Sequence, residues 1–270
     1  MTQNVYTTLS QPIFIGNLMK SGASLLRAMI SQHPNLFGSF ETFWFEKDLT
    51  NAPASKGVTY LKKLFEVDDE TFEGIRSQST TSMEAFDRFM SYCTLRVGKK
   101  RWIDKSPDNI IHFKIIREQW PDMKFIHVVR DFRDTYASWK RSNKNYSAID
   151  FVEKVKENYC EISDLIGKKT DQYLEIRHED NILNAKGVMS ELLNYLNEPW
   201  VDGIDKNPEY NYEYEKLYEV TGIKGTSVLG LKKPIFSGQV GQYKEILTEE
   251  EIKTIDIGLK ECLTLYGYVS

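Results

Sequence analysis

The sequence has few cysteines and no apolar stretch long enough to cross a membrane. Its three cysteines, Cys93, Cys160 and Cys262, lie far apart without CxxC or Cys/His spacing, so we expect reduced thiols rather than disulfides or a metal site. No stretch approaches the roughly 18 apolar residues of a membrane helix, and no charged segment followed by an apolar one opens the chain. We therefore expect a cytoplasmic protein without a membrane partner.

A strong charge of one sign is also missing. The net charge is −4 and the isoelectric point is near 5.7, which argues against broad electrostatic capture of nucleic acid or of an anionic membrane. Any site for an anion must therefore be local. The length of 270 residues and the hydrophobic content of 41% predict a single globular domain spanning residues 1–270.

The most informative stretch is PIFIGNLMKSGASLLR, residues 12–27. A short apolar run enters a turn that contains Gly16, Lys20, Ser21 and Gly22, and an apolar-periodic segment follows, which predicts a strand, a loop and a helix. Successive backbone N–H groups and the helix N-terminus would present partial positive charge to an anion. The loop is thus a candidate phosphate cradle, and the alternative is a tight strand–helix turn with an exposed lysine.

The loop departs from the common nucleotide-binding pattern G-x-x-x-x-G-K-[ST]. That pattern has its lysine directly after the second glycine, where this chain has Ala23 followed by Ser24, and the nearest lysine is Lys20. Kinases and NTPases use the missing lysine to reach the β- and γ-phosphates, with Mg²⁺ held by the adjacent hydroxyl. We expect a shorter anion and no metal, with a P-loop-type kinase or NTPase as the alternative.

An acidic residue surrounded by aromatic residues follows the first predicted helix. Glu41 is flanked by aromatic side chains at positions 40, 43, 44 and 45. Apolar surroundings make a carboxylate a better general base, so Glu41 is a candidate base, and a surface glutamate that caps a turn is the equal alternative. Residues 46–100 show helical patterning without readable chemistry, and we expect a helical insertion that shapes an acceptor pocket or lid.

Two further strands are predicted to end at basic residues. One short strand ends at Lys105, with Ser106 or Asp108 capping the helix after it. Because ligands bind at the carboxyl ends of parallel strands, Lys105 would lie near the Lys20 loop if the two strands are neighbours, and is otherwise a solvated charge. The run KFIHVV, residues 124–129, delivers Arg130 to another strand end.

A second anion contact is predicted on the helix after Arg130. An arginine at a strand end and Ser138, about two turns into the helix, can converge on a second phosphate. Arg133 and Asp134 are predicted to be a structural pair on the helix surface. The remaining pattern predicts a helix over residues 149–167, a strand over 173–176, a loop over 232–243 and a last helix with a capping box of Thr248 and Glu251.

Together these residues resemble the sulfotransferases that use 3′-phosphoadenosine 5′-phosphosulfate (PAPS), in their bacterial and Golgi or tyrosylprotein-like branch. The resemblance follows order and spacing through PIFIGNLMKSGASLLRAMISQHP, FET, DKSPDN, FIHVVRDFRDTYASW, YLEIRHEDNILN, NYLNEPW and SGQVGQYKE. The loop joined to R-D-x-R-D with a serine eight residues after the first arginine is a specific combination. The resemblance implies a single α/β domain with a central parallel sheet flanked by helices.

The resemblance also implies roles for individual residues. Lys20, Ser21, Gly22, Ala23 and Ser24 match the loop that binds the 5′-phosphosulfate, and Arg130 and Ser138 match the pair that binds the 3′-phosphate. Glu41 matches a catalytic base, and Lys105 matches a lysine that stabilises the transferring sulfuryl group together with Lys20. PAPS is then the cosubstrate, 3′,5′-ADP (PAP) is the product, and no metal is required.

The sequence departs from the family pattern in three places. Ala23 replaces a common threonine, His178 replaces the tyrosine of Tyr-Glu-Asp, and Gln242-Tyr243 replace Arg-Trp in the C-terminal loop, where Gln242 is the expected cosubstrate contact. The last two changes leave the adenosine side open, so a non-catalytic nucleotide-binding module is the second alternative. The acceptor, a small molecule, carbohydrate or peptide, does not follow from the sequence, and neither does the oligomeric state.

Overall fold

A computed structural model describes residues 6–38, 41–45, 56–142, 146–160, 162–206 and 237–268. Phe40, the side chain of Cys160, the first ten residues of the expected insertion and residues 232–236 of the expected loop lie outside the described part. Among the described residues, Cys93 and Cys262 are free thiols.

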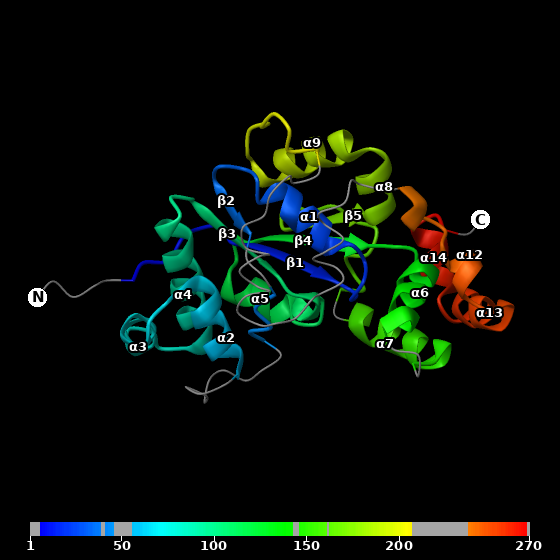
Figure 1. Ribbon diagram of the computed structural model, residues 1–270, viewed down its shortest axis with the longest axis horizontal. Helices are drawn as coiled ribbons and strands as arrows, with labels where there is room; N and C mark the ends of the chain where they lie inside the picture. The colour runs from blue at the N-terminus through cyan, green and yellow to red at the C-terminus, as the bar shows by residue number, and fades with distance from the viewer. Residues whose placement is uncertain are drawn as a thin grey trace, which may run out of the picture.

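The centre of the molecule is a five-stranded parallel sheet (Figure 1). Its strands are β1 (Ile13–Asn17), β2 (Leu36–Gly38), β3 (Arg101–Lys105), β4 (Lys124–Val129) and β5 (Tyr173–Arg177), in the order β2-β3-β1-β4-β5. Every neighbouring pair is parallel, and nearly all strand residues are buried, as expected for a sheet covered on both faces. The predicted α/β fold with a central parallel sheet is therefore confirmed.

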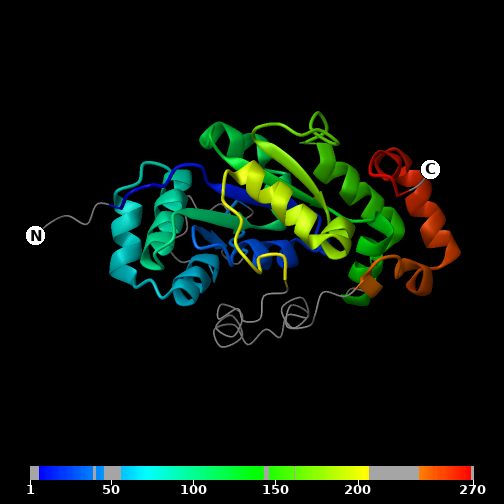
Figure 2. The same ribbon diagram turned by 90° about the horizontal axis from the view of Figure 1, so that it is seen from above.

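One face of the sheet packs against α1 (Ala23–Ile30) and α9 (Ala185–Leu196). Alternate strand residues, Ile13, Ile15 and Ile103 among them, join the apolar sides of these helices in one buried cluster. The short helix α8 (His178–Leu183) links β5 to α9 at this side (Figure 2). The period of two along each strand thus decides which residues face α1.

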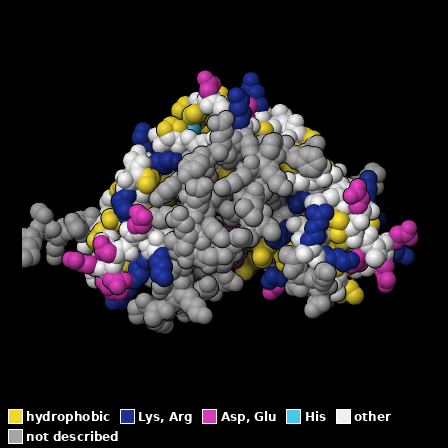
Figure 3. Space-filling model, in the orientation of Figure 1, with side chains coloured by type: hydrophobic (Ala, Val, Ile, Leu, Met, Phe, Trp, Pro, Cys, Tyr) yellow, Lys and Arg dark blue, Asp and Glu magenta, His cyan; other side chains and the backbone are white. Residues whose placement is uncertain are grey.

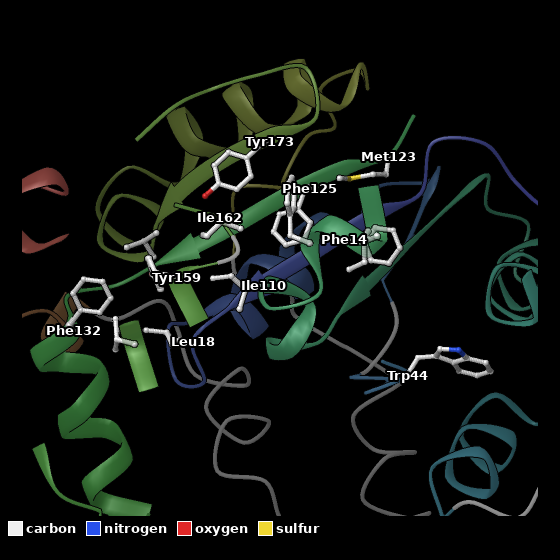
Figure 4. Close-up of a cluster of buried hydrophobic side chains, with 14 of the residues drawn as sticks. Phe14, Leu18, Trp44, Ile110, Met123, Phe125, Phe132, Tyr159, Ile162 and Tyr173 are labelled. Carbon is white, nitrogen blue, oxygen red and sulfur yellow. The ribbon is translucent and has the colours of Figure 1, made fainter. Parts of the chain in front are cut away.

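The opposite face carries the larger, aromatic cluster shown in Figure 4. Phe14, Trp102 and Phe125 alternate with the residues of the first cluster and pack against α4 (Ser82–Arg96), α5 (Phe113–Gln119) and α7 (Ala148–Cys160). Phe14 lies 5.2 Å from Trp102 between ring centroids in an edge-to-face arrangement. The two clusters make this one layered domain across the described residues.

Three helices occupy the described part of the expected insertion. They are α2 (Lys56–Phe65), α3 (Asp69–Ser77) and α4, and they lie at the β2 end of the sheet (Figure 1). Asp68 and Thr81 accept N–H groups of the first turns of α3 and α4, as N-cap residues do. Asp87 of α4 accepts the indole N–H groups of Trp102 and Trp120, which fixes this helix to the sheet.

The C-terminal helices cover α6 (Phe132–Ser142) and α7 at the other end (Figures 1 and 2). A 3₁₀ turn, η2 (Ser237–Gln239), leads into α12 (Tyr243–Ile246), α13 (Glu249–Gly258) and α14 (Lys260–Leu265). The predicted capping box of Thr248 and Glu251 is present at α13. Among the described residues, none of the helices has the length and apolar character needed to span a bilayer.

Two predicted boundaries are wrong. The helix expected over 149–167 ends at Cys160, and turns over residues 162–167 lead to Gly167, whose φ of 73° is in the left-handed region. The segment after Lys105 forms a 3₁₀ turn, η1 (Pro107–Ile110), before α5 begins at Phe113. The side chain of Ser106 does not cap the following helix as predicted, because its hydroxyl accepts the backbone N–H groups of Thr42 and Phe43 instead.

A buried carboxylate joins β5 to the C-terminal end of the chain. Glu175 accepts hydrogen bonds from the hydroxyls of Tyr173 and Tyr266 at 2.8 and 2.7 Å and from the Gly167 N–H at 2.7 Å. His127 Nδ1 lies 3.1 Å from the same carboxylate. Burial opposes ionisation, but the hydrogen bonds from His127 and the two tyrosines outweigh it and lower the pKa of Glu175.

Glu175→Gln is expected to destabilise the fold by about 2–4 kcal/mol at pH 7, because a carboxamide cannot accept all four donors. A carboxylate with a lowered pKa stabilises the fold above its unfolded pKa, and this contribution disappears as the pH falls through the folded value. The difference between the two proteins should therefore shrink below about pH 4.5. Urea unfolding at several pH values measures it, with Glu157→Gln on the exposed face of α7 as control. Equal destabilisation at all pH values would contradict the assignment.

Candidate active site

The loop after β1 has the geometry of an anion cradle. Gly22 adopts φ 85° and stands directly before α1, whose first residue is Ala23. Lys20 also has a positive φ, 71°, which is unusual for a residue with a side chain. Ser21 is buried and donates its N–H to Leu18 O at 3.1 Å, closing the turn. Lys20, Ser21, Gly22, Ala23 and Ser24 are thus brought together at the N-terminus of α1.

Lys105 reaches this loop from the neighbouring strand. β1 pairs with β3, as the prediction required, and Ile15 is opposite Lys105. The Lys105 ammonium is 3.2 Å from Ser24 Oγ and forms an ion pair with the Glu41 carboxylate. The Lys105 side chain is only 5% exposed and that of Glu41 is 38% exposed, so the lysine is buried while the carboxylate is accessible from solvent.

The aromatic residues beside Glu41 have another role than the expected apolar wall. Trp44 is buried, and its ring centroid is 4.9 Å from that of Phe86 on α4. Phe45 packs against Phe14 of β1. These contacts anchor the segment in the core, while the carboxylate of Glu41 faces Lys105. The described aromatic neighbours of Glu41 therefore hold its backbone in place.

Arg130 follows β4 and lies under the same loop. The residue is 5% exposed, and its guanidinium donates to Lys20 O at 3.1 Å and to Gln239 O at 2.8 Å. Burial lowers its pKa, and nearby Asp134, Glu179 and Asp131 oppose that shift. Among the described residues, the buried Nε atom has no hydrogen-bond partner. Arg130 thus connects the loop to the C-terminal segment and keeps its Nε–H available as a donor.

Ser138 and Gln242 lie on two segments that pack together. Ser138 is half-buried in the second turn of α6, which begins at Phe132. Gln242 precedes α12, and its side-chain oxygen accepts a hydrogen bond from Arg141 of α6 at 2.7 Å. The loop residues and Arg130 are thus in direct contact, whereas the contact that the structure gives for Gln242 is with α6.

His178, the first residue of α8, approaches the cradle from the end of β5. Its ring is buried against Gly22, where a Cβ atom would come within 2.1 Å of His178 Nδ1. Burial, together with the nearby Arg130 charge, lowers the pKa of His178 to about 3, so the ring is neutral near pH 7. This contact fixes glycine at position 22 in addition to its positive φ.

The expected surface pair of Arg133 and Asp134 is wrong, because both residues are buried and each has other partners. Arg133 donates to Asp131 at 2.7 Å and to Asp256 of α13 at 3.2 Å. Asp134 accepts the backbone N–H groups of Gly241 and Tyr243 at 2.7 and 2.9 Å. The sequence shows that Asp134 lies in the first turn of a predicted helix. It carries no pattern that would identify Gly241 and Tyr243 as its partners.

Two other residues that hold the site were missed by the sequence interpretation. Trp139 of α6 donates its indole N–H to Met19 O at 2.7 Å, which pins the cradle from the same helix as Ser138. Asp104 is fully buried beneath the Glu41 segment and accepts from Thr42 Oγ1 at 2.9 Å. Burial raises the pKa of Asp104 to about 6, against the effect of its hydrogen bonds.

Positive charge is concentrated at the site and does not cover a whole face of the described surface. The net charge of −4 led to the expectation of such a local anion site. In the described part of the face in Figure 3, lysine and arginine side chains are interspersed with aspartate and glutamate. The buried cations, Lys105 and Arg130, come instead from two strand ends that flank the β1 loop. Within the described ranges, histidine, cysteine, aspartate and glutamate form no group of three that could hold a metal ion.

Comparison with curated proteins gives weak but consistent similarity to protein-tyrosine sulfotransferases. The chain is 22% identical over 216 residues to protein-tyrosine sulfotransferase A of Caenorhabditis elegans, covering 74% of this chain and 53% of the relative. It is 24% identical over 218 residues to protein-tyrosine sulfotransferase 1 of Danio rerio, covering 75% and 58%. The chain thus spans about half the length of these curated relatives.

Solved structures with the same fold match almost the whole chain. The sulfotransferase domain of a Synechococcus olefin synthase superposes with a TM-score of 0.70 at 18% identity and covers 97% of this chain and 98% of its own. A mouse sulfotransferase complexed with PAP gives a TM-score of 0.56 at 14% identity, covering 96% and 89%. At these identities the likeness shows the fold.

The family itself is shown by a match to the sulfotransferase family model over residues 12–202. The matched range begins just before β1 and includes the cradle, Glu41, Lys105, Arg130 and His178. The resemblance of the motifs thus predicted the family correctly: this chain belongs to the sulfotransferase family.

Proposed function

We propose that the protein transfers the sulfuryl group of PAPS to a hydroxyl, or to an amine, of an acceptor. One observation carries the proposal: Lys105 contacts both the Glu41 carboxylate and Ser24 at the N-terminus of α1. A candidate base, a buried cation and an anion cradle thereby meet at one point of the sheet edge. Sulfuryl transfer needs an acceptor in line with the leaving oxygen, a base to take the acceptor's proton, and cations where the bridging oxygen gains charge.

The cradle would hold the 5′-phosphosulfate of PAPS. Residues 22–24 would offer backbone N–H groups at the α1 N-terminus, and Lys20 and Lys105 would supply cations for the charge that develops on the bridging oxygen. Arg130, with Ser138, would bind the 3′-phosphate. The buried Nε of Arg130, which has no partner in the structure, fits a site that a phosphate completes. Gln242 is proposed to contact the cosubstrate from the C-terminal segment.

Glu41 would take the acceptor's proton. Its side chain is partly exposed, so it can meet an acceptor that arrives from solvent, and the Lys105 ion pair sets its orientation. When the sulfuryl oxygen gains negative charge, Lys105 can share its ammonium between that oxygen and Glu41. The helical segment of residues 56–96 is proposed to border the acceptor site. A protein tyrosine is the acceptor that the relatives' names suggest, and a small molecule is the alternative acceptor class.

Arg130→Ala is expected to weaken binding of 3′,5′-ADP by about 100-fold, since a charged hydrogen-bonded contact is worth ~2–5 kcal/mol. Arg130→Lys, which keeps the charge but lacks the guanidinium geometry, should lie between Arg130→Ala and the native protein. Isothermal titration with and without EDTA measures both the affinity and its expected independence of metal. Arg76→Ala on the exposed side of α3 is the matched control. Unchanged affinity in Arg130→Ala would count against the two-phosphate site.

Glu41→Gln is expected to reduce sulfuryl transfer by about 10²–10⁴-fold while leaving 3′,5′-ADP binding unchanged, because general base catalysis is lost without altering the cradle. The rate is measured with labelled PAPS and a panel of phenols, sugars and tyrosine peptides. Glu73→Gln, on exposed α3, controls for loss of a surface charge. Full turnover by Glu41→Gln would remove the proposed base, and Mg²⁺-dependent turnover of ATP would favour the kinase alternative.

Gly22→Ala is expected to abolish 3′,5′-ADP binding without unfolding the protein. The added Cβ would meet the His178 ring and would also sit at a positive φ. The loop must then shift, and its N–H groups no longer converge on the anion. Titration of 3′,5′-ADP and circular dichroism test the two parts. Gly98→Ala, at a positive φ with open space around the new methyl, isolates the cost of φ from the collision. Retained affinity would contradict the cradle geometry.

A further inference from the structure

A directed hydrogen-bond network anchors the residues immediately after Glu41 to the end of β3. Thr42 and Phe43 donate their backbone N–H groups to Ser106 Oγ at 3.0 and 3.1 Å. Thr42 Oγ1 donates to Asp104 Oδ1 at 2.9 Å, and Ser106 Oγ lies 3.4 Å from the same oxygen. Thr42, Asp104 and Ser106 are all buried. The three bonds from Thr42 and Phe43 each link the residues after Glu41 to a residue adjacent to Lys105.

The network has one direction, which ends at Asp104. Ser106 Oγ accepts two backbone N–H groups, so its own hydrogen is free to point at the Asp104 carboxylate. In the same way, Thr42 Oγ1 accepts a hydrogen bond from the Trp44 N–H at 3.3 Å and donates its own hydroxyl hydrogen to Asp104. Asn109 Nδ2 donates to the second carboxylate oxygen at 2.9 Å. Asp104 is therefore surrounded by donors and acts only as an acceptor.

Asp104 is also rigidly placed in the sheet. It is opposite Phe14 of β1, on the face of β3 away from α1, whereas Lys105 contacts α1 at Ser24. Asn109 Nδ2 lies 3.2 Å from Ile15 O of β1 and thus fastens the carboxylate to the central strand. The two last residues of β3 consequently have different roles. Lys105 contacts the cradle, and Asp104 supports the segment that carries Glu41.

The segment needs such support because its backbone is strained. Phe43 adopts φ 49°, a left-handed conformation that costs free energy in a residue with a side chain. The hydrogen bond from the Phe43 N–H to Ser106 and the burial of the next residue, Trp44, hold Phe43 in this conformation. Without the Ser106 and Asp104 acceptors, the chain around Glu41 could relax and the carboxylate would move relative to Lys105.

We propose that Asp104, acting through Thr42 and Ser106, is a positioning residue that fixes the Glu41 carboxylate against Lys105 for proton transfer. This inference rests on the proposed sulfotransferase function. It assigns no chemistry to Asp104, Thr42 or Ser106, which contact the reacting groups only through the backbone and through Glu41. A displacement of about 1 Å in a catalytic group can lower a rate by about 10²-fold, so the network matters for the rate of transfer.

Thr42→Val and Thr42→Ser are the matched pair that tests the network. Valine keeps the shape of the side chain and removes the hydroxyl, and serine keeps the hydroxyl. Thr42→Val is expected to lower kcat by about 10–100-fold with the KM for PAPS and the affinity for 3′,5′-ADP unchanged, whereas Thr42→Ser should recover most of the rate. The assay follows 3′,5′-ADP release from PAPS with water or a tyrosine peptide as acceptor. A loss of 3′,5′-ADP affinity equal to the loss of rate would overturn the positioning role.

A double variant separates positioning from general stability. If Thr42 acts through Glu41, adding Thr42→Val to Glu41→Gln should lower the rate no further. An equal additional loss in that background overturns the inference while leaving the proposed base intact. Full turnover by Glu41→Gln, by contrast, would refute the proposed base itself.

Crystal structures of the two Thr42 variants test the inference without any acceptor. In Thr42→Val the Glu41 carboxylate is expected to leave Lys105, and in Thr42→Ser it should stay. A carboxylate that stays against Lys105 in Thr42→Val would refute the positioning role even if PAPS is never cleaved.

Discussion

The parallel pairing of β1 with β3 on one side and β4 on the other is the constraint on which the site depends. It brings the residues that follow three strands to one edge of the sheet, so the β1 loop lies between Lys105 and Arg130. Register matters as much as order, because side chains alternate between the two faces. A slip of β3 by one residue would exchange Lys105 with Asp104 and put a carboxylate, rather than an ammonium, beside the anion cradle.

The cradle is held in shape by contacts from α6 and the segment before it, in addition to the turn bond from Ser21 to Leu18. Arg130 and Trp139 donate to two successive carbonyl groups, those of Lys20 and Met19, and so fix the orientation of these two peptide groups. Arg130 also holds Gln239, and Asp134 holds Gly241, so the C-terminal segment is part of the same unit. The shape of the cradle and the position of the C-terminal segment are therefore coupled through one buried arginine.

Much of the fold was predictable because buried parallel strands have short apolar runs with polar residues at their ends. Lys105 and Arg130 were found by that rule, and the β1 loop by its glycine and its lysine. The positions of Thr42, Asp134 and Trp139 were not predictable, because each acts through a partner that is 62 to 120 residues away in sequence. The expected apolar wall around Glu41 failed for a related reason. The apolar character of the neighbouring aromatic residues indicates that they are buried, but not that they pack into the core rather than against the Glu41 carboxylate.

The position of Ala23 now has a structural explanation. In the common nucleotide-binding pattern a lysine at this place reaches forward over the phosphates from the first turn of the helix. Here the ammonium comes from the adjacent strand, since Lys105 lies beside Ser24, and it is tied to a carboxylate that can accept a proton. Ala23 is 1% exposed and packs with Leu26 and Met29 in the apolar cluster between α1 and the sheet, so a lysine here would bury a charge among apolar side chains. The exchange of one lysine for a lysine–glutamate pair suits a reaction in which an acceptor loses a proton as an anionic group is transferred to it.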